Sequence, residues 1–335
     1  MTAAPTAPPA PAAPAAPAPP TAAPRQLRWL LRLHRPAVTA WAAFTVLAAV
    51  ALLWLGGPLT SDAAAAWKDY RACAFDERCA YDQDAILAQK DLYRLTTYAL
   101  LTVPLLVAAW AGSALTGREA ESGTARLGWT QGVSPLRWLA ARLALPALLV
   151  TASTALLAAL HRWAWTAGDG RVDTAKPWYD AATFYAGGLL PVALALAGLA
   201  AGALAGLLLG RSLPALAAGA AALGALWTAL HHALPHLWPS VTRVSGPDEG
   251  PSGSGLWVGE GVLVAGGERA DAPCLNALAP GCRGELEQLG ATGFYRDFHP
   301  AAHYWPLQLV GAGVLLLVTA LLTVAAFRLL RRRTA

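Results

Sequence analysis

The strongest constraint in this sequence is a set of six stretches, each about 20 residues long, that are almost entirely apolar. A helix of about 20 residues is long enough to cross the hydrocarbon core of a bilayer. Only 13% of the 335 residues are charged, about half of what soluble domains carry, so the apolar surface exceeds what an interior could bury. We expect an all-α, polytopic membrane protein with six transmembrane helices at residues 37–59, 97–115, 138–160, 183–209, 212–234 and 305–327.

The first residues of the chain have a different composition from the rest. Residues 1–24 are nearly all Ala, Pro and Thr, and such a segment cannot bury a core. We expect it to be a disordered tail with polyproline character. Residues 25–335 then form a single six-helix domain.

Basic residues determine the expected orientation, because Lys and Arg concentrate on the cytoplasmic side of a bilayer. With both termini cytoplasmic, the segment 117–137 is an inner loop, and the outer loops are residues 60–96, 161–182 and 235–304. The inner segments then contain only two acidic residues, Glu119 and Glu121. They contain Arg25, Arg28, Arg32, Arg35, Arg118, Arg126, Arg137, Arg142, Arg211, Arg328, Arg331, Arg332 and Arg333. Arg142 lies inside the third span, near its inner end, and we expect its side chain to snorkel to the interface.

Four cysteines fall in two of the outer loops, two in each. Four cysteines allow three pairings, and free thiols are a further alternative. An oxidising exterior permits the simplest arrangement, local disulfides Cys73–Cys79 and Cys274–Cys282. The spacing within each pair is not that of a zinc knuckle, and we expect no metal site here.

The fourth span has a regular arrangement of glycines. Gly198, Gly202, Gly206 and Gly210 recur every four residues, which places them on one stripe of a helix. Small residues in such a stripe allow a neighbouring backbone to approach closely. We expect a tight helix–helix contact along it, although chance in an Ala- and Gly-rich chain is an alternative.

The spans lack the residues of several function classes. No Asp, Glu or Lys lies within them, which argues against an ion-coupled carrier. None of the three lysines follows a glycine, so there is no phosphate-binding loop and another polypeptide must supply any energy. We find no catalytic set. The histidines of "HHALPH" (His231, His232 and His236) suit an interfacial helix end better than a metal site.

The inner loop Gly117–Trp138 is far more polar than the spans on either side. Thr116 and Glu119 have capping-box spacing, which predicts the start of a short helix. Ser134 followed by Pro135 predicts the start of the third span. A polar helix here could lie along the membrane face and contact a partner, whereas an ordinary solvated loop is the alternative.

At these residues the sequence resembles the permease subunit of bacterial ABC-2-type ATP-binding-cassette transporters. That family has acidic residues, then Ser-Gly-Thr, a Leu-rich stretch and a Val-Ser segment followed by Arg between its second and third spans. The matching residues are Glu119, Glu121, Ser122, Gly123, Thr124, Leu127, Val133, Ser134 and Arg137. The segment "HPAAHYWPLQLV" before the last span is also similar to bacterial permeases of this group.

The resemblance implies that the loop docks on a separate ATPase. It implies that the coupling contacts are Glu119, Glu121, Ser122, Gly123, Thr124 and Arg126. This chain would hold no cofactor, because ATP binds to the ATPase subunit. It would pair with a second permease copy or a sibling permease in a bacterial plasma membrane, without nucleic acid, and would export its cargo. The alternative is a membrane-bound sensor or assembly factor whose last outer loop binds a ligand.

Overall fold

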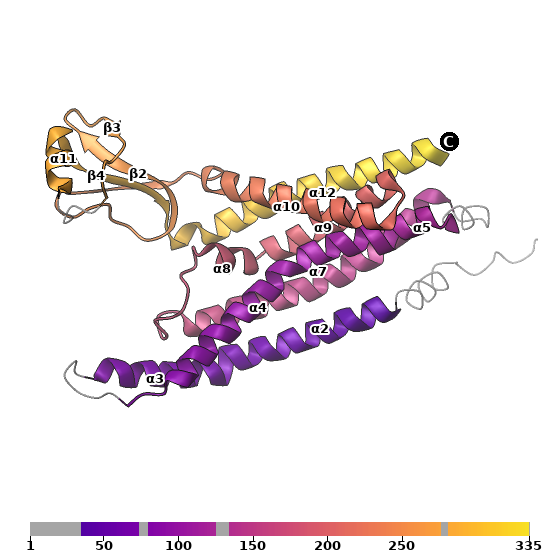
Figure 1. Cartoon of the computed structure of the whole chain (residues 1–335), viewed down its shortest axis with the longest axis horizontal. Coiled ribbons are helices and arrows are strands. Elements are labelled where there is room, and N and C mark those ends of the chain that lie inside the picture. The colour runs from indigo at the N-terminus through magenta and orange to yellow at the C-terminus, as the bar shows by residue number, and fades with distance from the viewer. Residues whose placement is uncertain (1–34, 74–79, 125–133, 276–280, 335) are drawn as a thin grey trace, which may run out of the picture. The chain divides into compact units, whose positions relative to one another are not determined.

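The computed structural model describes residues 35–73, 80–124, 134–275 and 281–334. The expected tail, residues 1–24, lies outside them. The chain divides into two compact units, Met1–Ala42 and Ala43–Ala335, and the second contains all the described helices and strands except the first turns of helix α2. Figure 1 shows the elements of the whole chain.

Six helical segments of the described chain are long and apolar enough to cross a membrane, which confirms the predicted class. The first comprises α2 (Arg35–Trp54), η1 (Leu55–Leu59) and α3 (Thr60–Ala72). The second comprises α4 (Gln83–Trp110), η2 (Ala111–Gly117) and α5 (Arg118–Glu121). The others are α7 (Pro135–Gly168), α9 (Leu190–Leu209), α10 (Ser212–Ala233) followed by η3 (Leu234–His236), and η4 (Ala301–His303) followed by α12 (Tyr304–Thr334).

The first two helical segments extend well beyond their expected spans. Helix α4 begins at Gln83 rather than near residue 97, because the side chain of Asp82 caps it by accepting a hydrogen bond from the amide of Ala85 at 3.0 Å. Much of the outer loop expected at residues 60–96 is therefore helical. Hydropathy finds only the part of a helix that lies in lipid, whereas caps and propensity carry the helix into water.

The fourth span, expected as one helix over 183–209, is broken. A short helix α8 (Ala181–Ala186) ends before α9, and Gly188 between them has φ +67°, which favours glycine. Buried Gln308 of α12 bridges the break. Its Oε1 accepts from the amides of Leu189 and Leu190 at 2.9 and 3.1 Å, and its Nε2 donates to the carbonyl of Phe184 at 2.9 Å. The freed backbone groups are thus satisfied inside the protein, as a membrane requires.

The segment expected as the last outer loop, residues 235–304, contains a small sheet that the all-helical expectation did not include. Its strands are β1 (Val241–Ser245), β2 (Leu256–Val264), β3 (Arg269–Ala270) and β4 (Ala291–His299), in the antiparallel order β1-β4-β2-β3. Helix α11 (Cys282–Gln288) packs on it through a core of Val262, Cys282, Leu286 and Phe294. Cys274 and Cys282 form a disulfide. Cys73 is also disulfide-bonded, and Cys79, its expected partner, lies outside the described residues.

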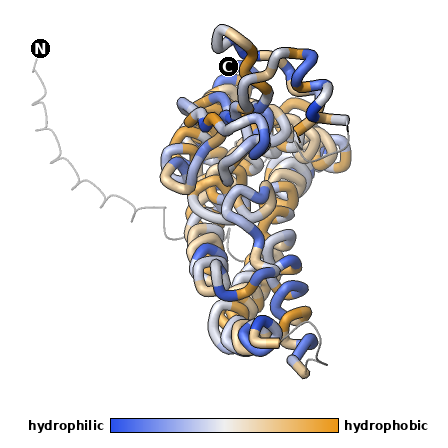
Figure 2. The backbone as a smooth tube through the Cα atoms, turned by 90° about the vertical axis from the view of Figure 1, so that its left-hand side faces the viewer, coloured by the Kyte–Doolittle hydropathy of each residue, from blue (hydrophilic) through white to orange (hydrophobic). Residues whose placement is uncertain are grey.

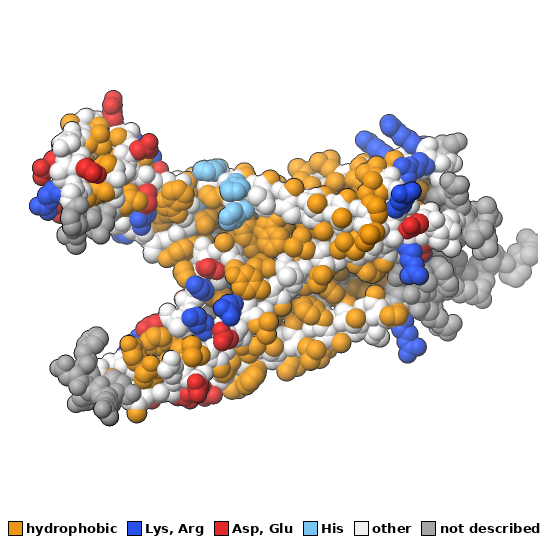
Figure 3. Space-filling view, in the orientation of Figure 1, with side chains coloured by type: hydrophobic (Ala, Val, Ile, Leu, Met, Phe, Trp, Pro, Cys, Tyr) orange, Lys and Arg blue, Asp and Glu red, His pale blue; other side chains and the backbone are white. Residues whose placement is uncertain are grey.

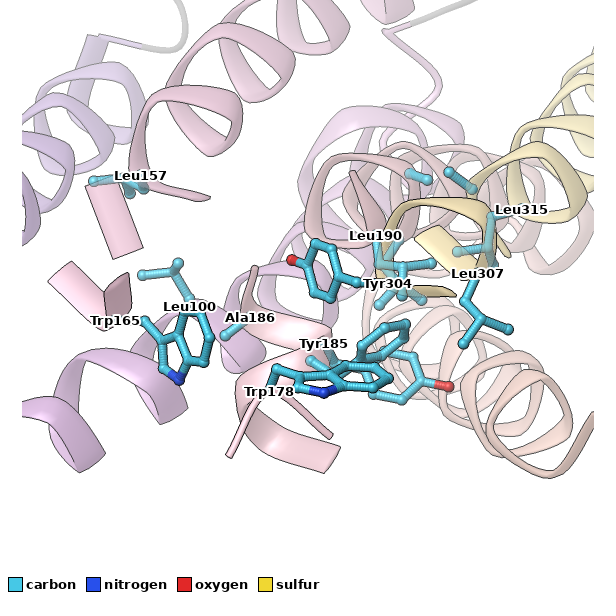
Figure 4. Close-up of a cluster of buried hydrophobic side chains, with 14 of the residues drawn as sticks. Leu100, Leu157, Trp165, Trp178, Tyr185, Ala186, Leu190, Tyr304, Leu307 and Leu315 are labelled. Atoms are coloured by element: carbon cyan, nitrogen blue, oxygen red, sulfur yellow. The ribbon is translucent and has the colours of Figure 1, made fainter. Parts of the chain in front are cut away.

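Helix α9 is the central helix of the membrane domain. It packs against α4, α7, α10 and α12, and most of its residues are buried. Near its start, aromatic and aliphatic side chains from several helices form a core that includes Trp178, Tyr185, Leu190 and Tyr304 (Figure 4). Apolar residues run along these helices (Figure 2), and hydrophobic side chains cover much of the surface that the helices turn away from the core (Figure 3). This outer surface is the one that lipid would cover.

The glycine stripe of α9 faces α4 and η2, but not over its full length. A Cβ atom at Gly198 would lie 2.6 Å from the carbonyl oxygen of Pro104, and one at Gly202 would lie 2.9 Å from the amide nitrogen of Gly112. At Gly206 it would lie 2.7 Å from the carbonyl oxygen of Gly112. Gly210 instead has φ +62° and ends α9 as its left-handed cap, with open space around it.

Substitution of Gly202 tests this close packing. We expect Gly202→Ala to destabilise the protein by about 1–3 kcal/mol, because the added methyl group meets backbone atoms that cannot rotate away. Gly224→Ala in α10 is the matched control, since nothing lies within 4 Å of its Cβ position and alanine favours the helix by up to about 1 kcal/mol. Unfolding of both purified variants in detergent measures the difference; equal stabilities would contradict the close contact.

Buried His299 ties the end of β4 to the chain after α10. Its Nε2 donates to the carbonyl of Pro235 at 2.9 Å, so its Nδ1 accepts from Nδ1 of His303 at 3.1 Å. Burial lowers the pKa of His299, and the nearby imidazoles of His303 and His236 lower it further, while the bond to Pro235 opposes the shift. The imidazole is therefore held neutral in the folded protein.

This histidine predicts acid sensitivity of the sheet. Its pKa is about 6.5 in the unfolded chain and lower in the folded one, so the unfolded state binds more protons below that pH. We expect protection of β4 amides against hydrogen exchange to fall as the pH drops below about 6.5. His299→Gln keeps a donor for Pro235 and should flatten this dependence, whereas exposed His232→Gln should not. A pH dependence unchanged in His299→Gln would assign it elsewhere.

Candidate functional site: the α5 end of the membrane helices

The acidic Ser-Gly-Thr stretch lies at one end of the helices, where it forms α5 and the turn after it. The amide of Ser122 donates to the carbonyl of Arg118 at 2.9 Å, and Gly123 has φ +70°. A glycine in this conformation ends a helix without strain. The hydroxyls of Ser122 and Thr124 lie 2.9 Å apart across the turn. The motif thus stops the long second helical segment and exposes Arg118, Ser122 and Thr124.

Glu119 faces the interior of the helix bundle. Its carboxylate forms an ion pair with Arg142 of α7, whose side chain is only 2% exposed, and the Glu119 side chain is 15% exposed. The Arg142 guanidinium also lies 5.1 Å from the centre of the Trp138 ring. Arg142 was expected to snorkel to the interface; its guanidinium extends to Glu119 of α5 at the end of the helices, where this carboxylate satisfies its charge within the protein. Such a pair joins α5 to α7.

Glu121 contacts a different helix. Its Oε2 accepts hydrogen bonds from the amide and the hydroxyl of Ser212, at 3.0 and 2.7 Å, at the first residue of α10. Helix α10 has no side-chain cap of its own at Arg211, so Glu121 supplies it from another segment. A carboxylate at this position satisfies free amides and interacts favourably with the helix dipole. The two acids of the motif therefore attach α5 to α7 and to α10.

Thr116 does not act as the expected helix cap. The second helical segment runs without interruption from α4 through the π-helical η2 into α5, so no helix begins at Thr116. Its hydroxyl donates instead to the carbonyl of Ala203 in α9 at 3.1 Å. The capping-box prediction is wrong because its residues lie inside a continuing helix. The same side chain gives η2 a polar contact with α9.

A cavity of about 240 Å³ lies behind α5. Glu119 and Arg333 contribute its charged groups, and the rest of its lining comes from Thr116, Ala120, Gly123, Trp138, Leu207, Gly210, Leu329 and Leu330. The Arg333 guanidinium donates to the carbonyls of Leu207 and Leu208 at the C-terminal end of α9. A cation at this helix end compensates the free carbonyls there.

The remaining residues of the predicted site divide into two groups. Ser134 caps α7 by accepting from the amide of Arg137, with Pro135 at the first helical position, as predicted. Arg126, Leu127 and Val133 lie outside the described residues. Within the described parts of the chain, no group of three or more His, Cys, Asp or Glu side chains could hold a metal ion.

Six apolar helices, with basic side chains gathered at the end that bears α5 and the C-terminus, define a multi-pass membrane protein (Figure 3). A family model described as ABC-2 membrane transporter related matches residues 42–234, more than half of the chain. The chain belongs to this family of ABC-2-type transporters, and its role is that of a membrane permease. No curated protein and no solved structure matches the sequence. The family assignment covers α5 and the glycine stripe but ends before the four-stranded sheet.

The Glu119–Arg142 pair gives a testable energy. We expect Arg142→Leu to destabilise the protein by about 3–5 kcal/mol, since it leaves a largely buried carboxylate unpaired. The double variant Glu119→Leu/Arg142→Leu should regain most of that loss, and unfolding in detergent measures both. Arg94→Leu removes an exposed pair with Asp91 and should cost at most about 1 kcal/mol. If the loss of stability in the double variant equalled the sum of the losses in Glu119→Leu and Arg142→Leu measured separately, the two residues would not be coupled.

Proposed function

We propose that this chain is the membrane-spanning subunit of an ATP-driven exporter and that a separate ATPase subunit supplies the energy. The observation that carries the proposal is the placement of α5. It ends the second helical segment, it exposes polar side chains, and its two carboxylates are bonded to α7 and α10. A partner that pushes on α5 would act on three membrane helices at once.

The contacts divide the motif into two roles. Exposed Arg118, Ser122 and Thr124 are available to a partner protein. Glu119 and Glu121 bond to other helices of the same chain, although the Glu121 side chain is also exposed, and both would transmit a displacement of α5 to those helices. This refines the sequence hypothesis, in which both acids contact the ATPase. Arg126 belongs to the same docking segment in that hypothesis.

The charges support an orientation with the α5 end in the cytoplasm, where an ATPase would have access to it. Basic side chains gather at that end (Figure 3), and the disulfide of Cys274 and Cys282 belongs to the opposite side, consistent with an oxidising exterior. The proposal includes a second permease copy, or a sibling permease, in a bacterial plasma membrane. ATP binds to the ATPase subunit, and this chain needs no cofactor of its own.

The test of the proposal is co-purification of the tagged full-length chain with an ATP-binding-cassette ATPase from its native membranes, followed by measurement of ATP hydrolysis. We expect Glu121→Ala and Ser212→Ala each to reduce hydrolysis while the ATPase remains bound. Either change removes a charge-assisted hydrogen bond between α5 and α10. Thr228→Ala is the matched control on α10, because that hydroxyl bonds only to the carbonyl of Gly224 in its own helix.

The two possible partners of Glu121 give different results. Loss of the ATPase in Glu121→Ala, with normal binding in Ser212→Ala, would place the ATPase rather than α10 opposite this carboxylate. Absence of any co-purifying ATPase under conditions that keep the membrane complex intact would contradict the proposal and favour the membrane sensor or assembly factor.

A further inference from the structure

A second cavity, of about 250 Å³, lies at the opposite end of α4 from Glu119. It is enclosed by the start of α4, the end of α7, the chain between α7 and α8, and α8 itself. Figure 3 shows basic and acidic side chains gathered in a hollow at this end of the helices. The lining consists of Gln89, Lys90, Tyr93, Arg94, Thr97, Tyr98, Ala164, Trp165, Gly168, Thr174, Ala175, Lys176, Asp180, Ala182 and Thr183.

Two polar groups in this lining have no partner within the described chain. The Gln89 side chain is 4% exposed and makes no hydrogen bond to any described residue. The buried hydroxyl of Thr174 likewise lacks a partner. Burying an amide or a hydroxyl without a hydrogen bond is costly, and proteins rarely leave such groups unsatisfied. The amide of Gln89 is open to the cavity, so a molecule inside it would supply the missing bonds, whereas the hydroxyl of Thr174 lies behind the lining.

Other polar groups of the lining are already satisfied, which makes the unpartnered ones more informative. The hydroxyls of Tyr93 and Thr183 lie 2.9 Å apart, and Asp180 accepts from the amide and the hydroxyl of Thr183, both at 3.1 Å. The Asp180 carboxylate thereby caps α8. The indole of Trp165 donates to the carbonyl of Lys176 at 2.8 Å, which fixes the backbone beside the cavity.

The charges of the lining select an anion. Lys90 and Lys176 form no ion pair with any described residue, and Arg94 has only an exposed contact with Asp91, at 3.5 Å. The one carboxylate of the lining, Asp180, is occupied as a helix cap. Three exposed cations therefore border a site that contains the unpartnered amide of Gln89, and ammonium and guanidinium groups are the usual partners of phosphate oxygens.

An apolar path leads away from the same cavity. On α4, next to Arg94, the side chains of Leu95 and Tyr98 are 66% and 56% exposed, at the point where the apolar span expected over 97–115 begins. The ring of Trp165 lies on the inner side of the lining and is 8% exposed. An anionic group in the cavity could thus continue into acyl chains that lie along α4. This geometry suits a lipid better than a fully polar solute.

We propose that this cavity binds the phosphate group of an anionic lipid, with Lys90 and Lys176 contacting the phosphate and Gln89 hydrogen-bonding the headgroup. The volume is large enough for a headgroup and smaller than the usual pocket for a whole drug-sized ligand. The site requires no ATPase and no transport step. It therefore stands independently of the function proposed above.

The test uses the purified full-length chain in detergent and native mass spectrometry. The probes are dioctanoyl phosphatidylglycerol, dioctanoyl phosphatidylcholine and inorganic phosphate. We expect phosphatidylglycerol to bind at least about tenfold more tightly than phosphatidylcholine, and Lys90→Ala/Lys176→Ala to weaken its binding about tenfold or more. Lys68→Ala is the matched control, because Lys68 is the third lysine of the chain, is exposed and lies outside the lining.

Gln89→Leu separates the headgroup contact from the charge. We expect this variant to bind phosphatidylglycerol several-fold more weakly while its melting temperature is unchanged or higher, since it replaces an unpartnered buried amide by an apolar group of similar size. Unchanged binding in Gln89→Leu would show that water alone satisfies this amide and would overturn its assigned contact.

The remaining outcomes decide the source of the phosphate. Tight binding of phosphatidylglycerol with weak binding of inorganic phosphate assigns the site to a lipid. Equal affinity for inorganic phosphate would overturn the lipid and leave a free-anion site. Equal binding of both lipids, or equal loss of binding in Lys68→Ala, would overturn the site itself.

Discussion

Close contact between helix backbones at the middle of α9 is the constraint on which the rest of the membrane domain depends. Lipid removes the hydrophobic drive for helices to associate, so packing and hydrogen bonds must hold them together. Gly112, Gly202 and Gly219 meet where η2, α9 and α10 cross, and a Cβ atom at Gly219 would lie 2.9 Å from the Cα atom of Gly202. This approach brings η2 and the start of α10 together, since a Cβ atom at Gly117 would lie 3.1 Å from the Cα atom of Ser212. Only because the backbones are this close can Glu121 reach the amide of Ser212.

Polar interactions join the same helices where they leave the apolar region. Glu119 holds Arg142 at one end, and Gln308 bridges the break between α8 and α9 at the other. Each satisfies groups that would otherwise be left in a medium without water. Removing one partner therefore leaves the other buried without a hydrogen bond. The free-energy cost of that unpartnered group exceeds the net contribution of the contact to stability. Under the proposed function this makes α5 a rigid attachment, because its displacement without movement of α7 and α10 would break both carboxylate contacts.

The sequence predicted the features that follow from local composition and missed those that depend on tertiary contacts. Hydropathy located all six spans, and the Ser134–Pro135 pair located the start of α7. The break at Gly188 was missed because the residue that satisfies its free backbone groups, Gln308, lies 120 residues away in the sequence. The partner of Arg142 was missed because nothing local in the sequence shows that Glu119 faces it. The sheet was missed because β1 and β3 are short, with five and two residues, and because β4, the last strand of the chain, pairs between β1 and β2.

The two candidate sites lie at opposite ends of one continuous helical segment, Gln83–Glu121. Near the start of this segment, Gln89 and Lys90 line the cavity of about 250 Å³. At its C-terminal end, Glu119 and Glu121 bond to α7 and α10. Between them the segment changes to the π-helical η2, a geometry that is rare in proteins overall but common at functional sites. There Gly112 lies against α9, so the segment is held at both ends and at its middle. Helix α4 packs tightly against α9, and neither the glycine contact nor the buried ion pair leaves room for one helix to move without the other. A shift of the α5 end would therefore reach the residues around the cavity that Gln89 and Lys90 line.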